Sequence, residues 1–401
     1  MAVSQNPAVR LKPRRALPFF SRHPWVFAGA IAAVEGHPQV GDEVRLISAD
    51  GQFIARGLYN PHSQIRVRLY SWQDGPIGAE LWSSRLARAA SLREQLFPAD
   101  DPARRACRLV FSEGDGLSGL TVDRYGDWLL THWTSAALWE QRDLLLDLLW
   151  QQWQPQGIWL RTEKGMSELE QLVAVDGLVR GASPPPELHI SEHGVTYRVD
   201  VVTGQKTGFY YDQRENRLAA ARYAAGARVL DVCSYSGGFG LTALVRGGAE
   251  SVLAIDSSRP ALELAARNAE LNGVAQRYQT LPGDAAARMA ELVARQEQFD
   301  LVVLDPPKLA RTRAGASRAG KGYTRLNGLA VQLVRPGGIL VTCSCSGLVS
   351  LPEFQQAVVQ GALQAQRELQ LLEQRFQAVD HPVSAHCLET EYLKCLIARV
   401  H

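Results

Sequence analysis

Two cysteines near the C-terminal end have types and spacing that suit covalent chemistry. Cys343 and Cys345 lie in the stretch GGILVTCSCSGLV (337–349), one residue apart, and each is followed by serine. A metal site would need further Cys or His ligands nearby, and a disulfide between cysteines at this spacing would be strained. The pair therefore contains buried core cysteines, a nucleophile, or one of each.

Position along the chain separates the two cysteines. The apolar run GILVTC is typical of a buried strand, so Cys343 lies in this strand or at its end. Cys345 lies two residues further, beyond the strand, although strand alternation puts both on the same face. Position therefore favours Cys345 as the nucleophile and Cys343 as a core residue. Elsewhere, Cys107, Cys233 and Cys395 are interpreted as small core residues.

The elements that position these cysteines alternate between strands and helices from about residue 195 onward. Helical segments such as 259–273 separate short apolar runs that end in polar residues or glycine. Four such runs are 227–237, 251–258, 299–308 and 337–346. The pattern predicts an α/β domain with a mostly parallel, doubly wound sheet, in which ligands bind outside the carboxyl ends of the strands.

Polar residues at these strand ends predict a nucleoside site. Asp231 ends the first strand, and Gly237 and Gly238 let the backbone approach a ligand before a helix begins. Asp256 ends the second strand and can accept hydrogen bonds from ribose hydroxyls, with helix capping as the alternative. Asp284 follows a third extended stretch, beside the expected adenine. This arrangement resembles the S-adenosylmethionine (SAM) site of class I methyltransferases.

The sequence Asp305-Pro306-Pro307 resembles the D/N-P-P motif of methyltransferases that act on nucleobases. A carboxylate held by prolines can bind the polar edge of a flipped base. Lys308 follows where enzymes that methylate amino groups usually have an aromatic residue, which argues against amino-group methylation and leaves room for chemistry at carbon. Addition of a thiolate to C6 of cytosine makes C5 nucleophilic, and this chemistry requires a cysteine such as Cys345 at a neighbouring strand end.

The N-terminal part has the pattern of a small β domain. In residues 40–72, Asp50-Gly51 is a hairpin signal between two alternating runs. In IRVRLY the apolar side chains can face a core while Arg66 and Arg68 point outward. Simple solvation and an RNA-facing basic surface are both open for these arginines.

The composition limits the partners and the compartment. The 401 residues include 43 Lys and Arg against 41 Asp and Glu, so affinity for nucleic acid must come from local patches. One candidate is 308–325, with six basic residues and no acidic one, which is either a solvated flexible loop or a phosphate clamp. Six scattered cysteines indicate a reducing, cytoplasmic compartment, and no apolar run is long enough to cross a membrane.

Through these residues the sequence resembles the ribosomal RNA large-subunit methyltransferase I family, whose members make 5-methylcytosine in 23S rRNA. The resemblance covers almost the whole chain and implies three domains. They are a PUA-type RNA-binding β domain (1–74), a central α+β domain (75–190) and a class I, Rossmann-like SAM methyltransferase domain (191–401). The motifs that carry it are SRHPWVFAGAI, ARGLYNPHSQIRVR, SEGDGLSGLTVDRYG, GQKTGFYYDQRENR, SYSGGF, DPPK, SCSGL and DHPV with a later YLK.

The resemblance implies a reaction and a set of site residues. The reaction is SAM-dependent methylation of C5 of a cytosine in 23S rRNA, with Cys345 as the nucleophile and Asp305 beside it. The implied cofactor-binding residues are Asp231, Ser234, Tyr235, Ser236, Gly237, Gly238, Asp256, Asp284 and Asp305. The expected RNA-contacting residues are Lys308, Arg311, Arg313, Arg318, Lys321, Arg66, Arg68 and Arg214. No metal is expected, no membrane partner, and a homodimer is one candidate assembly.

Several alternatives stay open at this point. Lys308 occupies the place of a second cysteine found in other RNA 5-methylcytosine enzymes, so the group that removes the C5 proton is open. Arg214 either shapes the pocket or forms an ion pair at a helix start. The rival functions are N-methylation of a guanine or cytosine in rRNA, and a non-catalytic RNA-binding factor in ribosome assembly.

Overall fold

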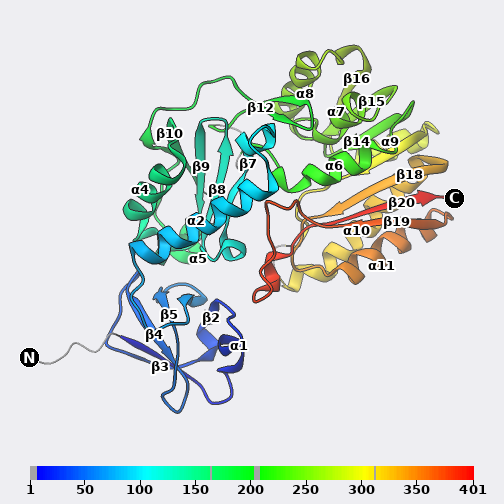
Figure 1. Cartoon of the computed structure of the whole chain (residues 1–401). Coiled ribbons are helices and arrows are strands. Elements are labelled where there is room, and N and C mark those ends of the chain that lie inside the picture. The colour runs from blue at the N-terminus through cyan, green and yellow to red at the C-terminus, as the bar shows by residue number, and fades with distance from the viewer. Residues whose placement is uncertain (1–6, 163–164, 203–207, 311–312) are drawn as a thin grey trace, which may run out of the picture. The chain divides into compact units, whose positions relative to one another are not determined.

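The computed structural model describes residues 7–162, 165–202, 208–310 and 313–401 (Figure 1). The chain forms two compact units, each assembled from several segments. The first unit comprises Met1–Leu188, Asp200–Gly208 and Asp380–Thr390, and the second comprises His189–Val199, Phe209–Val379 and Glu391–His401. Among the described residues, the helices lack the combination of length and apolar content that crossing a membrane requires.

The first unit begins with a six-stranded sheet of order β2-β6-β5-β4-β1-β3. The strands are β1 (Ala8–Leu11), β2 (Trp25–Phe27), β3 (Ile31–Glu35), β4 (Glu43–Ile47), β5 (Phe53–Tyr59) and β6 (Ile65–Ser71), and one short helix is α1 (Leu17–Phe20). β4 and β5 form the predicted antiparallel hairpin, and Gly51 in its turn has a φ of 90°. Val9, Leu46 and Val67 are fully buried in the core of this sheet.

Arg68 on β6 corrects one prediction, because its side chain does not point into solvent. It is buried and forms ion pairs with Glu113 at 3.2 Å and Glu170 at 3.5 Å. The same guanidinium donates to Ser118 Oγ at 3.0 Å. Burial of a charged group is tolerated when opposite charges and acceptors surround it, and these partners are remote in sequence. Arg68 is therefore unsuited to contact RNA in this conformation, whereas Arg66 is half-buried.

A five-stranded sheet of order β11-β10-β9-β8-β7 completes the first unit. Its strands are β7 (Ala106–Phe111), β8 (Leu120–Tyr125), β9 (Trp128–Trp133), β10 (Gly157–Arg161) and β11 (Gly177–Gly181), with helices α2 (Ala79–Leu96), α3 (Ala136–Trp139), α4 (Arg142–Trp153) and α5 (Met166–Glu170). Trp82 from α2 and Leu145 from α4 are buried in its core. Glu140 and Gln141 separate α3 from α4.

The second unit contains a seven-stranded sheet of order β16-β15-β14-β17-β18-β20-β19. Its strands are β14 (Arg228–Val232), β15 (Ser251–Asp256), β16 (Tyr278–Pro282), β17 (Phe299–Leu304), β18 (Val334–Ser344), β19 (Leu369–Arg375) and β20 (Lys394–Val400). β14 to β18 are parallel, and β20 runs antiparallel between β18 and β19. The strand order reverses at β14, which puts a ligand crevice between the ends of β14 and β17. The predicted α/β fold is confirmed.

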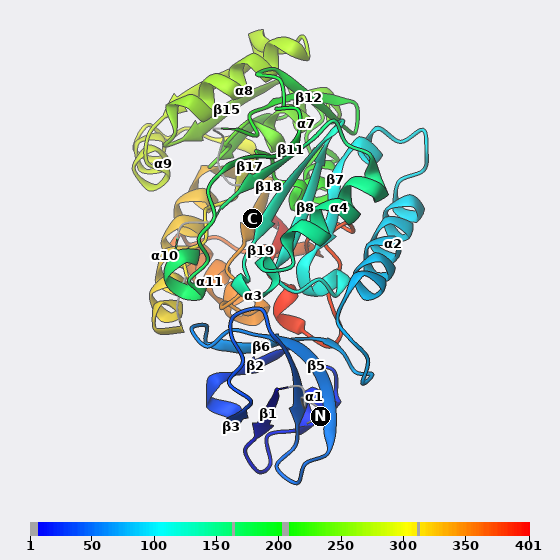
Figure 2. The same ribbon diagram turned by 90° about the vertical axis from the view of Figure 1, so that its left-hand side faces the viewer.

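Helices cover both faces of this sheet (Figures 1 and 2). On one face α6 packs on α7 and α7 on α8, and on the other α10 packs against α9 and α11. These helices are α6 (Arg214–Ala221), α7 (Gly238–Val245), α8 (Arg259–Leu271), α9 (Ala285–Ala294), α10 (Arg313–Leu333) and α11 (Leu351–Gln364). A hairpin of β12 (Leu188–Glu192) and β13 (Val195–Val199) precedes them in the chain.

The basic run 308–325 differs from a flexible loop, because α10 includes its residues from Arg313 onward. Ala319, Tyr323 and Ala330 of this helix are buried in the core beneath it. Their spacing of four and seven residues is that of one helical face. Burial of this face therefore outweighs the low helix propensity of the glycines between them.

Candidate active site at the carboxyl edge of the seven-stranded sheet

Asp231 ends β14 and lies beneath the turn that follows it. Its carboxyl is buried, and Oδ2 accepts a hydrogen bond from the Gly240 amide at 2.8 Å. Oδ1 is also buried and has no hydrogen-bond partner among the described residues. Burial raises the pKa of Asp231 to about 7, and the nearby carboxylates of Asp305 and Asp256 contribute to this rise. The site thus contains a carboxyl group with an acceptor position available to a ligand.

The turn after β14 is tightly folded around several backbone hydrogen bonds. Cys233 and Tyr235 have positive φ values of 63° and 48°, and Gly237 has a φ of 87°. The Tyr235 amide donates to Asp256 Oδ2 at 2.9 Å. A Cβ atom on Gly237 would lie 2.8 Å from the Tyr278 hydroxyl, so this position requires glycine for both conformation and space. Gly237 therefore meets a requirement of the turn itself, and the approach of a ligand to this backbone stays a prediction.

Asp256 and Asp284 both have structural partners in addition to any ligand. Asp256 Oδ1 accepts from the Ser258 amide at 2.8 Å, and Ser258 itself caps α8. Asp284 is exposed and caps α9 by accepting from the Ala287 amide at 2.9 Å. Carboxylate oxygens have further lone pairs, so these bonds leave acceptor capacity for hydroxyl or amino groups.

The residues present fit SAM, which carries an ammonium group, ribose hydroxyls and no phosphate. The open Oδ1 of Asp231 suits a cation, and the half-buried carboxylate of Asp256 suits hydroxyl donors. A Cβ atom on Gly238 would lie 3.0 Å from Arg217 Cδ, so the inner side of the glycine turn is already filled.

Asp305 and Cys345 come together at the ends of neighbouring strands. Asp305 follows β17, and its Oδ2 accepts from Gln213 Nε2 at 3.0 Å. Cys345 follows β18, and its thiol donates to the carbonyl of Pro306 at 3.9 Å. Cys345 is half-buried. The aspartate-proline-proline segment and the half-buried cysteine thus form one wall of the site.

The two serines around Cys345 fix its surroundings. Ser344 Oγ donates to the Tyr323 hydroxyl at 2.8 Å. Ser346 Oγ accepts from the Leu309 amide at 3.1 Å and lies 3.0 Å from the same hydroxyl. These bonds join the segment after β18 to α10 and to the segment after Pro307. The Ser-Cys-Ser sequence therefore positions the thiol, a role that the sequence did not indicate.

Cys343 lies in the core, as the sequence predicted. Its side chain is fully buried on β18, where its register partner on β20 is Cys395. Burial raises the pKa of the Cys343 thiol well above its ordinary value. A thiol that does not ionise is a poor nucleophile, so Cys343 suits a packing role and not covalent chemistry.

Tyr210 is a site residue that sequence reasoning missed. Its ring lies edge-on to Tyr235, with centroids 5.3 Å apart. Burial raises its pKa, and the charges of Asp212, Asp305 and Cys345 contribute to this rise. The phenol stays neutral over the physiological range. Its signal was the aromatic pair in GFYYDQRENR, a stretch in which only Arg214 is a predicted site residue.

Arg214 corrects a second prediction, since it is buried and cannot contact RNA in this conformation. Its side chain is 1% exposed, and Nε lies 3.6 Å from Glu192 Oε2. Its guanidinium also stacks over the ring of Tyr211 at 5.4 Å. The alternative of an ion pair at a helix start is therefore the observed arrangement, because Arg214 begins α6.

Of the other predicted RNA-contacting residues, Lys308, Arg318 and Lys321 belong to the second unit. Lys308 is exposed beside the aspartate-proline-proline segment, and Arg318 and Lys321 are exposed on α10. Arg311 lies outside the described residues, and the side chain of Arg313 is not among those described. Arg325 is a further exposed cation, on the same face of α10 as Arg318 and Lys321. We call Arg318, Lys321 and Arg325 the basic stripe.

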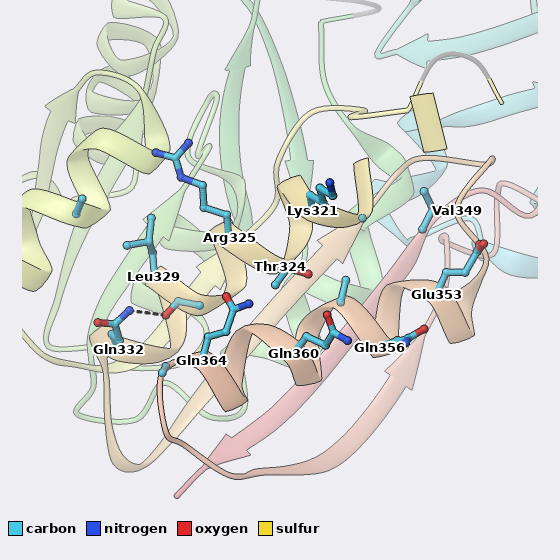
Figure 3. Close-up of a pocket in the computed structure, with 15 residues that line it drawn as sticks. Lys321, Thr324, Arg325, Leu329, Gln332, Val349, Glu353, Gln356, Gln360 and Gln364 are labelled. Atoms are coloured by element: carbon cyan, nitrogen blue, oxygen red, sulfur yellow. Dashed lines mark hydrogen bonds between the residues drawn. The ribbon is translucent and has the colours of Figure 1, made fainter. Parts of the chain in front are cut away.

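A groove of about 750 Å³ lies between α10 and α11 (Figure 3). Two members of the basic stripe, Lys321 and Arg325, line it. Thr324 and Gln332 from α10 and Glu353, Gln356, Gln360 and Gln364 from α11 add polar groups. The groove is separate from Asp231 and Cys345, which are not among its lining residues.

Among the described residues one cluster has the composition of a metal site, in the first unit. His23 Nε2 and Cys387 Sγ lie 3.4 Å and 3.5 Å from Glu389 Oε2. The Trp25 amide donates to His23 Nδ1, so Nε2 carries the proton of the neutral ring. A metal would need the lone pair of Nε2, and the cluster is accounted for as a hydrogen-bond network.

Family models match both ends of this architecture. A PUA-like domain matches residues 9–72, and an S-adenosylmethionine-dependent methyltransferase matches residues 178–374. A candidate methyltransferase solved in complex with SAH has the same fold, with a TM-score of 0.85 at 19% identity over 98% of this chain and 99% of that chain. The protein is therefore a SAM-dependent methyltransferase with a PUA-like domain, as predicted.

Curated relatives narrow this class. A ribosomal RNA large subunit methyltransferase I from Erwinia tasmaniensis is 41% identical over 94% of this chain and 96% of its own. The protein of the same name from Shewanella denitrificans is 40% identical over 98% and 99%. The chain belongs to the ribosomal RNA large subunit methyltransferase I family.

Proposed function

We propose that the protein methylates C5 of a cytosine in 23S rRNA through a covalent bond between Cys345 and C6 of the base. The observation that carries this proposal is the half-buried Cys345 thiol, 3.9 Å from the Pro306 carbonyl in the segment that begins with Asp305. The names of the relatives support ribosomal RNA as the substrate.

The thiolate of Cys345 adds to C6 and moves electron density to C5. SAM, held by the residues at the ends of β14 and β15, would supply an electrophilic methyl group for transfer to C5. Loss of the C5 proton then restores the double bond and expels the cysteine. Asp305, held by Gln213 Nε2 at 3.0 Å, accepts a hydrogen bond from the polar edge of the base and orients it.

The cofactor-binding residues remain those of the prediction. Asp231 and Asp256 receive the ammonium and ribose groups, and Asp284 lies toward the adenine. The backbone of the glycine turn contacts the ligand. These residues are Asp231, Ser234, Tyr235, Ser236, Gly237, Gly238, Asp256, Asp284 and Asp305.

The RNA backbone binds along Lys308 and the basic stripe. Arg318, Lys321 and Arg325 present three exposed cations along one side of α10, and the amide side chains of the adjoining groove can hydrogen-bond phosphate or base edges (Figure 3). This surface needs no large net charge on the molecule. A homodimer stays a prediction.

Trapping with RNA that contains 5-fluorocytidine tests the covalent step. Fluorine cannot leave C5 as a cation, so the adduct accumulates and appears in denaturing gels and intact-mass spectra. We expect an adduct with the wild type and with Cys343→Ala, the matched control, and none with Cys345→Ala. Methyl transfer to a ring or amino nitrogen without an adduct would favour N-methylation instead. Absence of SAM turnover by the wild type would favour an assembly factor.

A further inference from the structure

Lys394 at the start of β20 is a buried ammonium whose role the mechanism above leaves unassigned. Its residue is 3% exposed. Nζ donates to the carbonyl of Ser346 at 2.8 Å and to the carbonyl of Tyr392 at 2.9 Å. Ion pairs of Lys394 with carboxylates are absent from the described structure. A buried cation that only neutral carbonyls hold is costly, so an anion nearby would stabilise it.

The thiolate of Cys345 is one anion that can stabilise Lys394. Lys394 is the register partner of Ser344, the last residue of β18, and Cys345 follows directly after Ser344. Burial lowers the pKa of Lys394 to about 8, and the Cys345 charge is the first of those that raise it. Glu391 and Glu353 act in the same direction, and Lys308 opposes them.

We propose that Lys394 is a positioning residue that keeps its ammonium beside Cys345 and favours the thiolate form of this nucleophile. Ser346, the residue after Cys345, connects Lys394 to this wall of the site: its carbonyl accepts from Lys394 Nζ, and its hydroxyl accepts from the Leu309 amide. The inference rests on the proposed function only in its assumption that the Cys345 thiolate attacks C6 of the base. The effect of Lys394 on ionisation of the Cys345 thiol does not require RNA.

The other groups around Cys345 make such a cation necessary. The charge of Cys345 acts on Tyr210 and on Tyr323 of α10, and Asp305 acts on both tyrosines as well. Both phenols have raised pKa values and stay neutral, while the Asp305 carboxylate opposes a second negative charge nearby. Lys394 offsets this repulsion until pH rises through its own pKa.

The test is the pH dependence of alkylation of Cys345 by iodoacetamide, followed by mass spectrometry of its peptide. We expect an apparent pKa in the wild type below the ordinary thiol value of about 8.5. In Lys394→Met we expect this value to rise by about one unit, which slows alkylation at pH 7 about tenfold. Lys394→Arg keeps the positive charge and should retain most of the reactivity. Cys345→Ser identifies the signal.

Identical pH curves for the wild type and Lys394→Met would overturn the inference. If Lys394→Met does not fold, the wild-type curve decides, since an apparent pKa at or above about 8.5 overturns it equally. The proposed function fails separately. In that case alkylation depends on Lys394 as expected, yet 5-fluorocytidine RNA forms no adduct with the wild type.

Discussion

Burial of the Asp231 carboxyl makes the stability of the second unit depend on pH. Its pKa is about 7 in the folded protein, against about 3.9 for an unfolded aspartate. Between these values the folded state binds more protons than the unfolded state. Stability therefore falls as pH rises from about 4 to about 7, and the contribution is constant above this range.

Asp231→Asn should remove this pH dependence, because the amide stays neutral and its oxygen can still accept from the Gly240 amide. Relative to the wild type, the variant should gain on the order of a few kcal/mol between pH 5 and pH 8. Thermal unfolding at several pH values measures the difference. The transition of the second unit is identified as the one that SAM shifts in the wild type. Parallel curves for the two proteins would show that Asp231 ionises freely in the fold.

Sequence reasoning located single residues well where one strand pattern decides them. The end of an apolar run separated Cys343 from Cys345 in burial. The same reasoning failed for Arg68 and Arg214, since their burial depends on Glu113, Glu170 and Glu192, which no local pattern brings near them. Ion pairs between distant segments override the alternation of a strand.

At the scale of elements, one ion pair anchors the segment that carries Tyr210. Arg217 on α6 forms two hydrogen bonds with Glu192 on β12, at 2.7 Å and 2.8 Å, and both side chains are buried. Arg217 also donates to the Tyr210 carbonyl at 3.0 Å and fills the space beneath Gly238. This pair therefore connects β12, α6 and the glycine turn.

Glu192→Gln should destabilise the second unit strongly, because it leaves buried arginines without their carboxylate. We expect a loss of about 3–5 kcal/mol in unfolding free energy and weaker SAM binding. Thermal unfolding and calorimetric titration with SAM measure the two effects. Glu291→Gln is the matched control: its partner Arg288 is one helical turn away on α9, Arg288 is half-buried and Glu291 is exposed, so its loss should stay below about 0.5 kcal/mol. Equal effects of the two variants would contradict this assignment.

Element types were predictable where periodicity is strong and composition agrees with it. The four apolar runs from 227 to 346 became β14, β15, β17 and β18 in the predicted order. The basic run 308–325 was ambiguous, because its glycines are unfavourable in a helix. Its buried face at Ala319 and Tyr323 becomes visible only once the neighbouring helices are in place.

At the scale of the whole molecule, nearly balanced charge makes RNA affinity a local property. The formal net charge is +2, so non-specific attraction is weak and the basic stripe on α10 must supply much of it. Binding through phosphate contacts releases counterions, which makes affinity fall with salt.

Replacement of Arg318, Lys321 and Arg325 by Gln should weaken RNA binding and reduce its salt dependence. The slope of log K against log salt should decrease by about 0.7–0.9 for each phosphate that the variant no longer neutralises. Fluorescence anisotropy at several salt concentrations measures both quantities. Arg267→Gln, an exposed arginine on α8, is the control and should leave the slope unchanged. A triple variant with the wild-type slope would place the RNA path elsewhere.

Which segments belong to which unit could not be predicted from local sequence patterns. Residues Asp380–Thr390 count with the first unit although they lie between β19 and β20 of the second. Asp380 Oδ2 accepts from the Arg108 amide at 2.9 Å, and its carbonyl accepts from Arg93 Nη2 at 2.8 Å. Hydrogen bonds over more than 270 positions leave no trace in a local window.

This interleaving has a consequence for the order in which the protein is made. The chain passes between the two units five times, and the last passage comes after Thr390. Synthesis runs from the N-terminus, so residues 1–188 emerge long before Asp380, the acceptor for Arg93 and Arg108, becomes available. The first unit therefore lacks these two hydrogen bonds until nearly the whole chain has been synthesised. A segment that ends at residue 188 cannot form them, so it does not contain the complete first unit.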